Sequence, residues 1–253
     1  MPQLLVRRPS PRLADGELTH LERTPVDAAL ALEQWRGYVE AFRARGWDVI
    51  EVEPADDHAD GVFIEDAVVV FDDLAVLTSP GAASRRGEIE SAARAVAATG
   101  LDDVARIEEP AHLDGGDVLK IGRTAYVGLG SRTDAAGIEA LRALIGPRGW
   151  EVLAVPVTRV LHLKSGVTAL PDGTVLGYEP LVDDPSVYPE FLAVPEPEGV
   201  AVVVLDPSTV LMSASAPRTA DLLRARGLEV ITTPVTEFEK LEGCVTCLSV
   251  RVR

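Results

Sequence analysis

The sequence has few of the residues and segments that mark several common protein classes. Among its 253 residues are only 2 cysteines, 4 histidines and 5% aromatic residues. No apolar run reaches the ~18 residues that a membrane span needs, and no apolar signal-peptide segment stands at the N-terminus. We therefore expect a soluble, cytoplasmic protein with reduced thiols. Val, Leu and Ala must fill most of its core.

Basic residues are also scarce. The chain has 24 Lys and Arg against 40 Asp and Glu, a net charge of −16. Such a charge repels phosphate backbones, so we expect neither nucleic acid nor a membrane as a partner. It attracts small cations, although acidity also commonly serves solubility alone. The sequence leaves self-association open.

A helical stretch that ends at a glycine, followed at once by a strand-like run, recurs along the chain. The helical stretches are Ala31–Gly46, Arg85–Gly100, Thr133–Gly149 and Pro217–Gly227. Glycine is the expected residue after a helix because it adopts the left-handed conformation without steric cost. The pattern predicts a mixed α/β fold built by repetition.

The interval between the last two closing glycines is long enough for two units, and Thr174–Pro195 is the candidate for the fifth. About five units are therefore predicted. Repeats of this size favour an arrangement around an axis, where polar turns converge on one place. An open parallel sheet is the alternative. No linker divides the chain, so we expect one catalytic domain over residues 1–253.

Cys247 and His162 are the first candidates for chemistry. Both lie in apolar segments, EGCVTCLSV and VLHLKSGV, which we interpret as strands that end near turns. A thiol can attack an electrophilic carbon while a histidine protonates the leaving group and activates water. The alternatives are a buried structural cysteine and histidine, or a redox or zinc role for Cys244 and Cys247. A zinc site would need a second ligand pair.

Carboxylates are the next candidates. Asp114, in HLDGGDVLKIG, could orient the histidine, and the two glycines permit close approach of the backbone to a ligand. Asp60, Glu65 and Asp66 surround a predicted strand that buries residues 62–64. Carboxylates beside an apolar run must face water or bind a cation, and a planar guanidinium matches them well. No further metal ligand lies near them at suitable spacing.

Two arginines occupy equivalent turns of two repeats. Arg85 lies in SRR and Arg132 in SRT, each just before a helix. A cation is unfavourable at a helix N-terminus. Their positions therefore indicate a partner anion, such as the carboxylate of a substrate.

Taken together, these segments resemble the dimethylarginine dimethylaminohydrolase family of the guanidino-group modifying (pentein) superfamily. The matching segments are FIEDAVVV, PGAASRR, LDGGDV, VGLGSRT, LHLKS and EKLEGCVTCLSV. LHLKS with the terminal TC-x-SV is specific to this family, whereas LDGGDV is shared with arginine deiminases and amidinotransferases. The resemblance implies a five-bladed, pseudo-symmetric α/β propeller (the pentein fold) and hydrolysis of methylated arginine to citrulline without a cofactor.

The resemblance also implies roles for individual residues. Cys247 is similar to the family's nucleophile, His162 to its general acid and base, and Asp114 to the acid that orients the histidine. The substrate-binding residues that it implies are Leu18 in a covering loop, Leu241 through its backbone, Asp60, Glu65 and Asp66 around the guanidinium and amino groups, and Arg85 and Arg132 for the carboxylate. No metal ligand is implied.

Two other functions remain open. One is arginine deiminase-like hydrolysis of an unmethylated guanidino substrate, because the sequence does not give the pocket volume around the terminal nitrogen. The other is a non-catalytic arginine-binding protein, against which the presence of Cys247, His162 and Asp114 argues.

Overall fold

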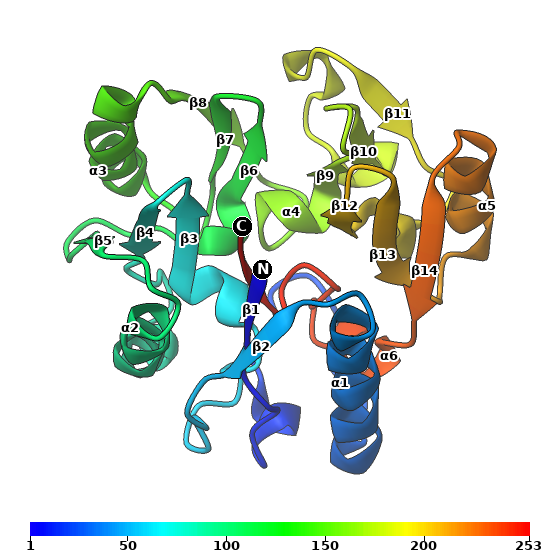
Figure 1. Cartoon of the computed structure of the whole chain (residues 1–253), viewed down its shortest axis with the longest axis horizontal. Helices are drawn as coiled ribbons and strands as arrows, with labels where there is room; N and C mark the ends of the chain where they lie inside the picture. Colours follow the sequence, from blue (N-terminus) through cyan, green and yellow to red (C-terminus); the bar gives the residue numbers. More distant parts are fainter.

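Five three-stranded sheets arranged around a central axis form the molecule (Figure 1). The computed structural model describes all residues, 1–253. The strands are β1 (Gln3–Val6), β2 (Asp48–Glu51), β3 (Val68–Phe71), β4 (Leu74–Leu77), β5 (Asp103–Arg106), β6 (Val118–Ile121), β7 (Thr124–Leu129), β8 (Glu151–Pro156), β9 (Val167–Ala169), β10 (Val175–Gly177), β11 (Phe191–Ala193), β12 (Val202–Asp206), β13 (Thr209–Ser213), β14 (Glu229–Thr233) and β15 (Val250–Val252). The helices are α1 (Ala28–Arg43), α2 (Ile89–Ala97), α3 (Ala135–Ile145), α4 (Leu163–Gly166), α5 (Pro217–Ala225) and α6 (Thr236–Glu239).

Every sheet follows one pattern. In β3–β4–β5, for example, the first two strands are antiparallel and the last two are parallel. Helix α2 makes the crossover to the parallel strand, as α1, α3 and α5 do in three other sheets. A parallel pair requires such a crossover because the chain must return to the same end of the sheet. This arrangement confirms the predicted five-unit propeller and excludes the open sheet.

Closure of the ring joins the two ends of the chain. Strand β15 pairs antiparallel with β1, with Leu4 opposite Arg251, and β1 pairs parallel with β2. The fifth sheet therefore consists of the first and last segments of the sequence. Figure 1 shows both termini near the centre of the ring. Closure brings the segment that carries Cys247 against loops from the first half of the chain.

The four glycines that were predicted to end helices all adopt the left-handed conformation. Gly46, Gly100, Gly149 and Gly227 have φ of 76°, 79°, 81° and 89°. The unit predicted at residues 174–195 also forms, as β10 and β11. Its crossover contains 3-10 helices at Glu179–Leu181 and Pro185–Val187 and no α-helix.

The core is largely aliphatic, as the composition predicts. Its largest cluster packs α1 against the neighbouring sheets through the ring of Phe42, which lies between Tyr38 and Trp47 and meets Trp47 edge to face. Asp27 caps α1 by accepting hydrogen bonds from the backbone N–H groups of Ala29 and Leu30. A fully buried side chain such as Phe42 stabilises the fold by about 2–3 kcal/mol. None of the helices combines the length and hydrophobicity of a membrane span.

The prediction of a strand is wrong for three segments. Cys247 lies in a turn before β15, His162 lies in a bend that leads into α4, and residues 62–64 lead into the 3-10 helix Ile64–Ala67. Val62, Phe63 and Ile64 are nevertheless buried, as predicted. Alternating apolar residues indicate that a segment is buried, but not that it is a strand. A turn at the centre of the ring is buried as fully as a strand is.

Candidate active site

A small pocket collects residues from loops of several sheets. Seven of the predicted site residues line it: Asp60, Asp66, Arg85, Arg132, His162, Leu241 and Cys247. Its other lining residues are Glu17, Phe63, Leu161, Glu242 and Gly243. The cavity volume is only about 20 Å³, so the pocket is closed over by the N-terminal segment that carries Glu17. It must open to admit a ligand the size of an amino acid.

His162 and Asp114 form a buried hydrogen-bonded pair. The Nε2 atom of His162 lies 3.0 Å from Oδ2 of Asp114, and both side chains are almost completely buried. The other oxygen of Asp114 accepts a hydrogen bond of 2.9 Å from the Gly81 backbone N–H. Asp114 is thus fixed by the backbone and in turn fixes the imidazole, which is the geometry that an orienting acid requires.

The charges around His162 hold it in the protonated form. Burial disfavours the imidazolium, but the nearby Asp66 and the hydrogen bond to Asp114 outweigh burial and raise the pKa of His162 to about 9. Nδ1 lies 3.8 Å from Oδ1 of Asp66. His162 and Arg85 in turn overcome the burial of Asp66 and lower its pKa to about 2. At neutral pH the site holds an imidazolium that can donate a proton.

The DGGD turn supports this pair. The Gly116 backbone N–H donates to Oδ1 of Asp66 over 2.8 Å. A Cβ atom at Gly116 would lie 2.6 Å from that oxygen and 2.8 Å from Nδ1 of His162, so only glycine fits. The two glycines were expected to let the backbone approach a ligand closely. At Gly116 the backbone instead approaches side chains of the site itself. Asp117 accepts hydrogen bonds from the Leu163 backbone N–H (2.8 Å) and the Thr133 hydroxyl (2.6 Å), which fixes the start of α4 beside His162.

The role of Asp117 was missed from the sequence. The only signal available was the second aspartate of DGGD, whose partners lie 16 and 46 residues away.

Cys247 is a buried thiol in a tight turn. Its backbone N–H donates to the Cys244 carbonyl over 3.1 Å, and its own carbonyl accepts from the Glu65 N–H over 3.2 Å. The two sulfurs lie 3.3 Å apart, and both cysteines are reduced. The hydrogen bond with Cys244, burial, and the charges of Glu65 and Asp66 raise the pKa of Cys247 well above its ordinary value. Cys247 is therefore a neutral thiol at neutral pH.

The two predicted carboxylate-binding arginines differ in their surroundings. The guanidinium of Arg85 is buried and bonds to Asp66, to both oxygens of Glu88, and to the carbonyls of Asp60 and Phe63. These contacts leave little of it for a substrate. Its expected role as a carboxylate clamp is therefore not what the geometry favours, because the partner anions belong to the chain.

Arg132 keeps the better geometry for binding a carboxylate. Its Nη2 atom donates to Oε2 of Glu17 over 2.9 Å, and this is its one ion pair. Glu17 was not predicted as a site residue. Asp60 lies beside Glu17 and accepts a 3.1 Å hydrogen bond from its backbone N–H. Burial raises the pKa of Asp60.

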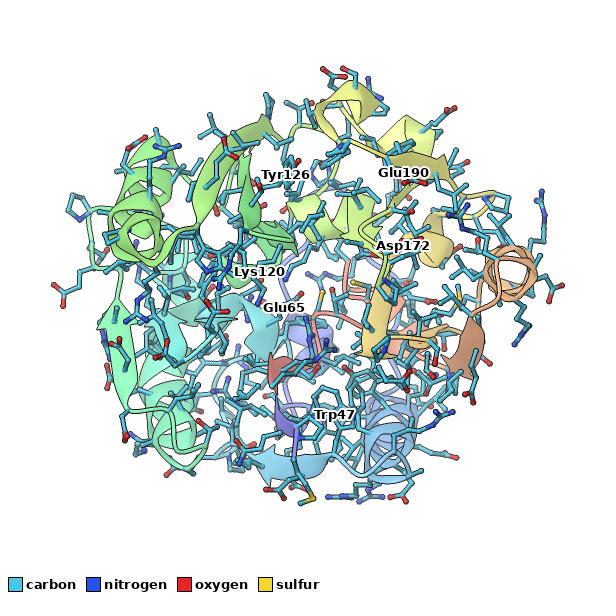
Figure 2. All side chains as sticks on the ribbon, turned by 45° about the horizontal axis from the view of Figure 1, so that its top comes forward. Trp47, Glu65, Lys120, Tyr126, Asp172 and Glu190 are labelled. Carbon is cyan, nitrogen blue, oxygen red and sulfur yellow. The ribbon has the colours of Figure 1, made fainter.

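Two predicted binding residues lie outside the pocket. Glu65 is buried, and its Oε1 atom pairs with Lys164 (2.6 Å) and Arg251 (2.8 Å). It lines a separate cavity of about 330 Å³, which contains neither Cys247 nor His162. Figure 2 shows Glu65 and Lys120 near the middle of the ring. Leu18 is half-buried against the hydrophobic core. The backbone N–H of Glu65 donates to the Cys247 carbonyl, but its side chain faces Lys164 and Arg251, so its place around the guanidinium stays a prediction.

Asp66, Asp114 and His162 offer ligand atoms within 4.8 Å of one another, a spacing that a metal ion can use. Each already has protein partners: Arg85 and Gly116 for Asp66, and the Asp114–His162 hydrogen bond for the other two. These contacts favour a fixed proton donor at His162 over a metal site.

Comparison with known proteins identifies the family. Residues 20–165 match the family described as N,N dimethylarginine dimethylhydrolase, eukaryotic. The chain is 61% identical over 249 residues to the N(G),N(G)-dimethylarginine dimethylaminohydrolase of Streptomyces coelicolor, covering 98% of this chain and 96% of the relative. The chain belongs to the dimethylarginine dimethylaminohydrolase family.

Other members of the dimethylarginine dimethylaminohydrolase family agree. The Pseudomonas aeruginosa enzyme is 33% identical over 251 residues, 98% of each chain. Its cysteine-to-serine mutant complexed with citrulline has a TM-score of 0.91 at 32% identity, covering 99% of this chain and 98% of the other. A dimethylarginine dimethylaminohydrolase adduct with S-methyl-L-thiocitrulline also gives 0.91, at 31% identity and full coverage of both chains. The family's five-bladed fold is thus present throughout this chain.

Proposed function

We infer that this protein hydrolyses N-omega-methylated arginine to citrulline, releasing dimethylamine from asymmetric dimethylarginine and methylamine from monomethylarginine. One observation carries the chemistry: a thiol, an imidazolium and a buried carboxylate, from Cys247, His162 and Asp66, line the same pocket. The Streptomyces coelicolor and Pseudomonas aeruginosa relatives are dimethylaminohydrolases, and the latter's structure contains citrulline.

We propose that the two ends of the substrate bind to opposite charges. Asp66, held ionised by His162 and Arg85, accepts the N–H groups of the guanidinium, and Asp60, which lies beside Glu17, accepts those of the α-amino group. Arg132 binds the α-carboxylate in place of Glu17. Bidentate pairing between a carboxylate and a guanidinium fixes the plane of the reacting group as well as its position. The roles proposed for Leu18 and Leu241 are to cover and line the pocket.

The reaction proceeds in two halves. Cys247 loses its proton to solvent as the substrate binds, its sulfur attacks the guanidinium carbon, and a C–S bond forms as the C=N π bond opens. The imidazolium of His162 protonates the departing amine as the C–N bond breaks, which leaves a covalent thiouronium. The neutral His162 then removes a proton from water, and the resulting hydroxide adds to the same carbon. The C–S bond breaks as the C=O bond of citrulline forms, and the hydroxyl proton passes to the sulfur, which restores the thiol. These steps use only side chains and water.

Asp114 makes His162 suitable for both halves. Its hydrogen bond fixes the ring and stabilises the imidazolium, as the acid does in other nucleophile–base–acid sets.

We also propose that residues 1–253 act as one catalytic domain, and that the protein is cytoplasmic. Catalysis requires Cys247 to stay reduced although a second thiol lies 3.3 Å away, which suits a reducing compartment.

The direct test is an assay of the purified protein with asymmetric dimethylarginine and, separately, with arginine. We expect equal amounts of citrulline and dimethylamine from the first substrate and little ammonia from the second. Faster release of ammonia from arginine would assign the protein to arginine deiminase-like hydrolysis. Binding of either substrate without citrulline would make it an arginine-binding protein.

A further inference from the structure

Cys244 has no role in the proposed reaction, yet its sulfur is in contact with that of the nucleophile. The two Sγ atoms are 3.3 Å apart, and the Cys247 N–H to Cys244 C=O hydrogen bond closes the turn between them. We propose that Cys244 is a modification site for peroxides, and that its oxidation ends in a reversible disulfide with Cys247. The resulting loss of activity rests on the proposed function, whereas formation of the disulfide does not.

The turn already holds the two thiols close to bonding geometry. A disulfide needs its sulfurs about 2.0 Å apart, so they must approach by roughly 1.3 Å. Both sulfurs belong to one four-residue turn, so their approach takes place within a single short segment. Cysteines at this Cys-x-x-Cys spacing form the reversible disulfides of thiol oxidoreductases. No third His, Cys, Asp or Glu side chain groups with these two sulfurs in a set suited to a metal ion.

The two thiols differ in exposure and in acidity. Cys244 is half-buried, whereas Cys247 is buried beneath the closed pocket. The hydrogen bond from the Cys247 thiol lowers the pKa of Cys244 to about 7, while the pKa of Cys247 is raised. The thiolate is the form that peroxides oxidise. Cys244 is therefore the thiol that reacts first, and Cys247 is the one that resolves the product.

The chemistry balances with a hydroperoxide as the only oxidant. The Cys244 thiolate attacks one peroxide oxygen, an S–O bond forms, the O–O bond breaks, and hydroxide leaves. The sulfur of Cys247 then attacks the resulting sulfenic acid. An S–S bond forms, the S–O bond breaks, and the departing hydroxide combines with the Cys247 proton. Two thiols and one hydrogen peroxide thus give one disulfide and two waters, and a dithiol reductant reverses the change.

The decisive experiment treats the reduced, full-length protein with hydrogen peroxide at pH 7.5. Both cysteines fall in one tryptic peptide, Leu241–Arg251, because the nearest cleavage sites are Lys240 and Arg251. We expect this peptide to lose the mass of two hydrogens and to resist alkylation of both thiols. Added dithiothreitol should restore the original mass and full citrulline formation. Mass spectrometry tests the disulfide even if the protein proves to have another activity.

Cys244→Ser is the matched control, since serine retains the size of the side chain and cannot form the bridge. The variant should be inactivated by peroxide roughly tenfold more slowly than the unaltered protein, because its remaining thiol is largely protonated. Cys244→Ala provides the same comparison if the serine variant folds poorly. Addition of oxygen to the wild-type peptide without loss of two hydrogens would overturn the proposal. Equal inactivation rates for wild type and variant would also overturn it.

Discussion

The carboxylate of Glu17 is bound to Arg132. Oε2 of Glu17 lies 2.9 Å from Nη2 of Arg132, and its Oε1 accepts the hydroxyl proton of Ser84. The Glu17 N–H also donates to Asp60. A carboxylate of the chain thus occupies the arginine at which we place the carboxylate of the substrate, and the pocket beneath it is almost closed. Opening of the site requires the exchange of one carboxylate for another.

Glu17→Gln should therefore bind substrate more tightly. The substitution removes the negative charge that competes with the substrate carboxylate for Arg132. A partly exposed ion pair contributes about 1 kcal/mol, so KM should fall by about fivefold with kcat little changed. Glu22→Gln removes the same charge from an exposed side chain of the same segment and should leave KM unaltered. Steady-state kinetics compares the two variants. A rise in KM for Glu17→Gln would mean that Glu17 binds the substrate itself.

Alanine substitutions of the two arginines of the pocket should have different effects. Arg132→Ala should raise KM and leave the fold intact, because Glu17 is partly exposed and can be solvated. Arg85→Ala removes the guanidinium that pairs with both buried carboxylates, Asp66 and Glu88, which costs about 3–5 kcal/mol and lowers Tm by about 10 °C. Arg86→Ala, which breaks an exposed pair, is the control. Thermal unfolding and KM separate the outcomes, and equal Tm values for the Arg85 and Arg86 variants would contradict this account.

The two cysteines should differ in importance for catalysis. Cys247→Ser should abolish citrulline formation because serine is not activated in an acidic pocket, whereas Cys244→Ser should keep most of it. Product formation in the absence of peroxide is the measurement. Equal losses in both variants would show that the pair acts as one unit, and Cys247 would lose its assignment as the sole nucleophile.

The pH dependence should report the proton of His162. Its pKa is raised from 6.5 to about 9, so the protonated acid is present at neutral pH and is lost as the pH rises through about 9. We expect kcat to fall above that pH. Asp114→Asn removes the carboxylate that stabilises the imidazolium, so the midpoint of the fall should move down by about one pH unit. An unchanged midpoint in Asp114→Asn would assign the alkaline limb to another group.

Substrate binding should favour the thiolate of Cys247. In the free protein its pKa is raised by Cys244, by burial and by nearby acids. A bound guanidinium brings the missing positive charge and should lower that pKa. Thiolate absorbance of the Cys244→Ser variant, titrated with and without a non-reacting amidine, measures the difference. A midpoint already well below neutral without the ligand would rule out this substrate-assisted deprotonation, as would one that does not fall when the amidine binds.

The sequence alone determined the repeating architecture. Each helix needs a residue that permits a left-handed turn before the next strand, and this is a local requirement of the backbone. Gly46, Gly100, Gly149 and Gly227 meet that requirement and therefore mark the ends of four units in the sequence itself. The sequence also placed Cys247, His162 and Asp66 among the candidate site residues. A thiol and an imidazole together can supply a nucleophile and a proton donor, a carboxylate beside an apolar run needs water or a cation, and the family resemblance gave each residue its role.

Only the tertiary structure decided which charges meet. Arg85 and Arg132 lie in similar turns, yet one is bound by Asp66 and Glu88 and the other by Glu17, 115 residues away. Glu65 stands beside Asp66 in sequence but turns its side chain towards Lys164 and Arg251. Neighbouring residues in a tight turn point in different directions, and closure of the ring sets what each of them faces. Ion pairs across sheets therefore depend on the assembled propeller, which no local pattern encodes.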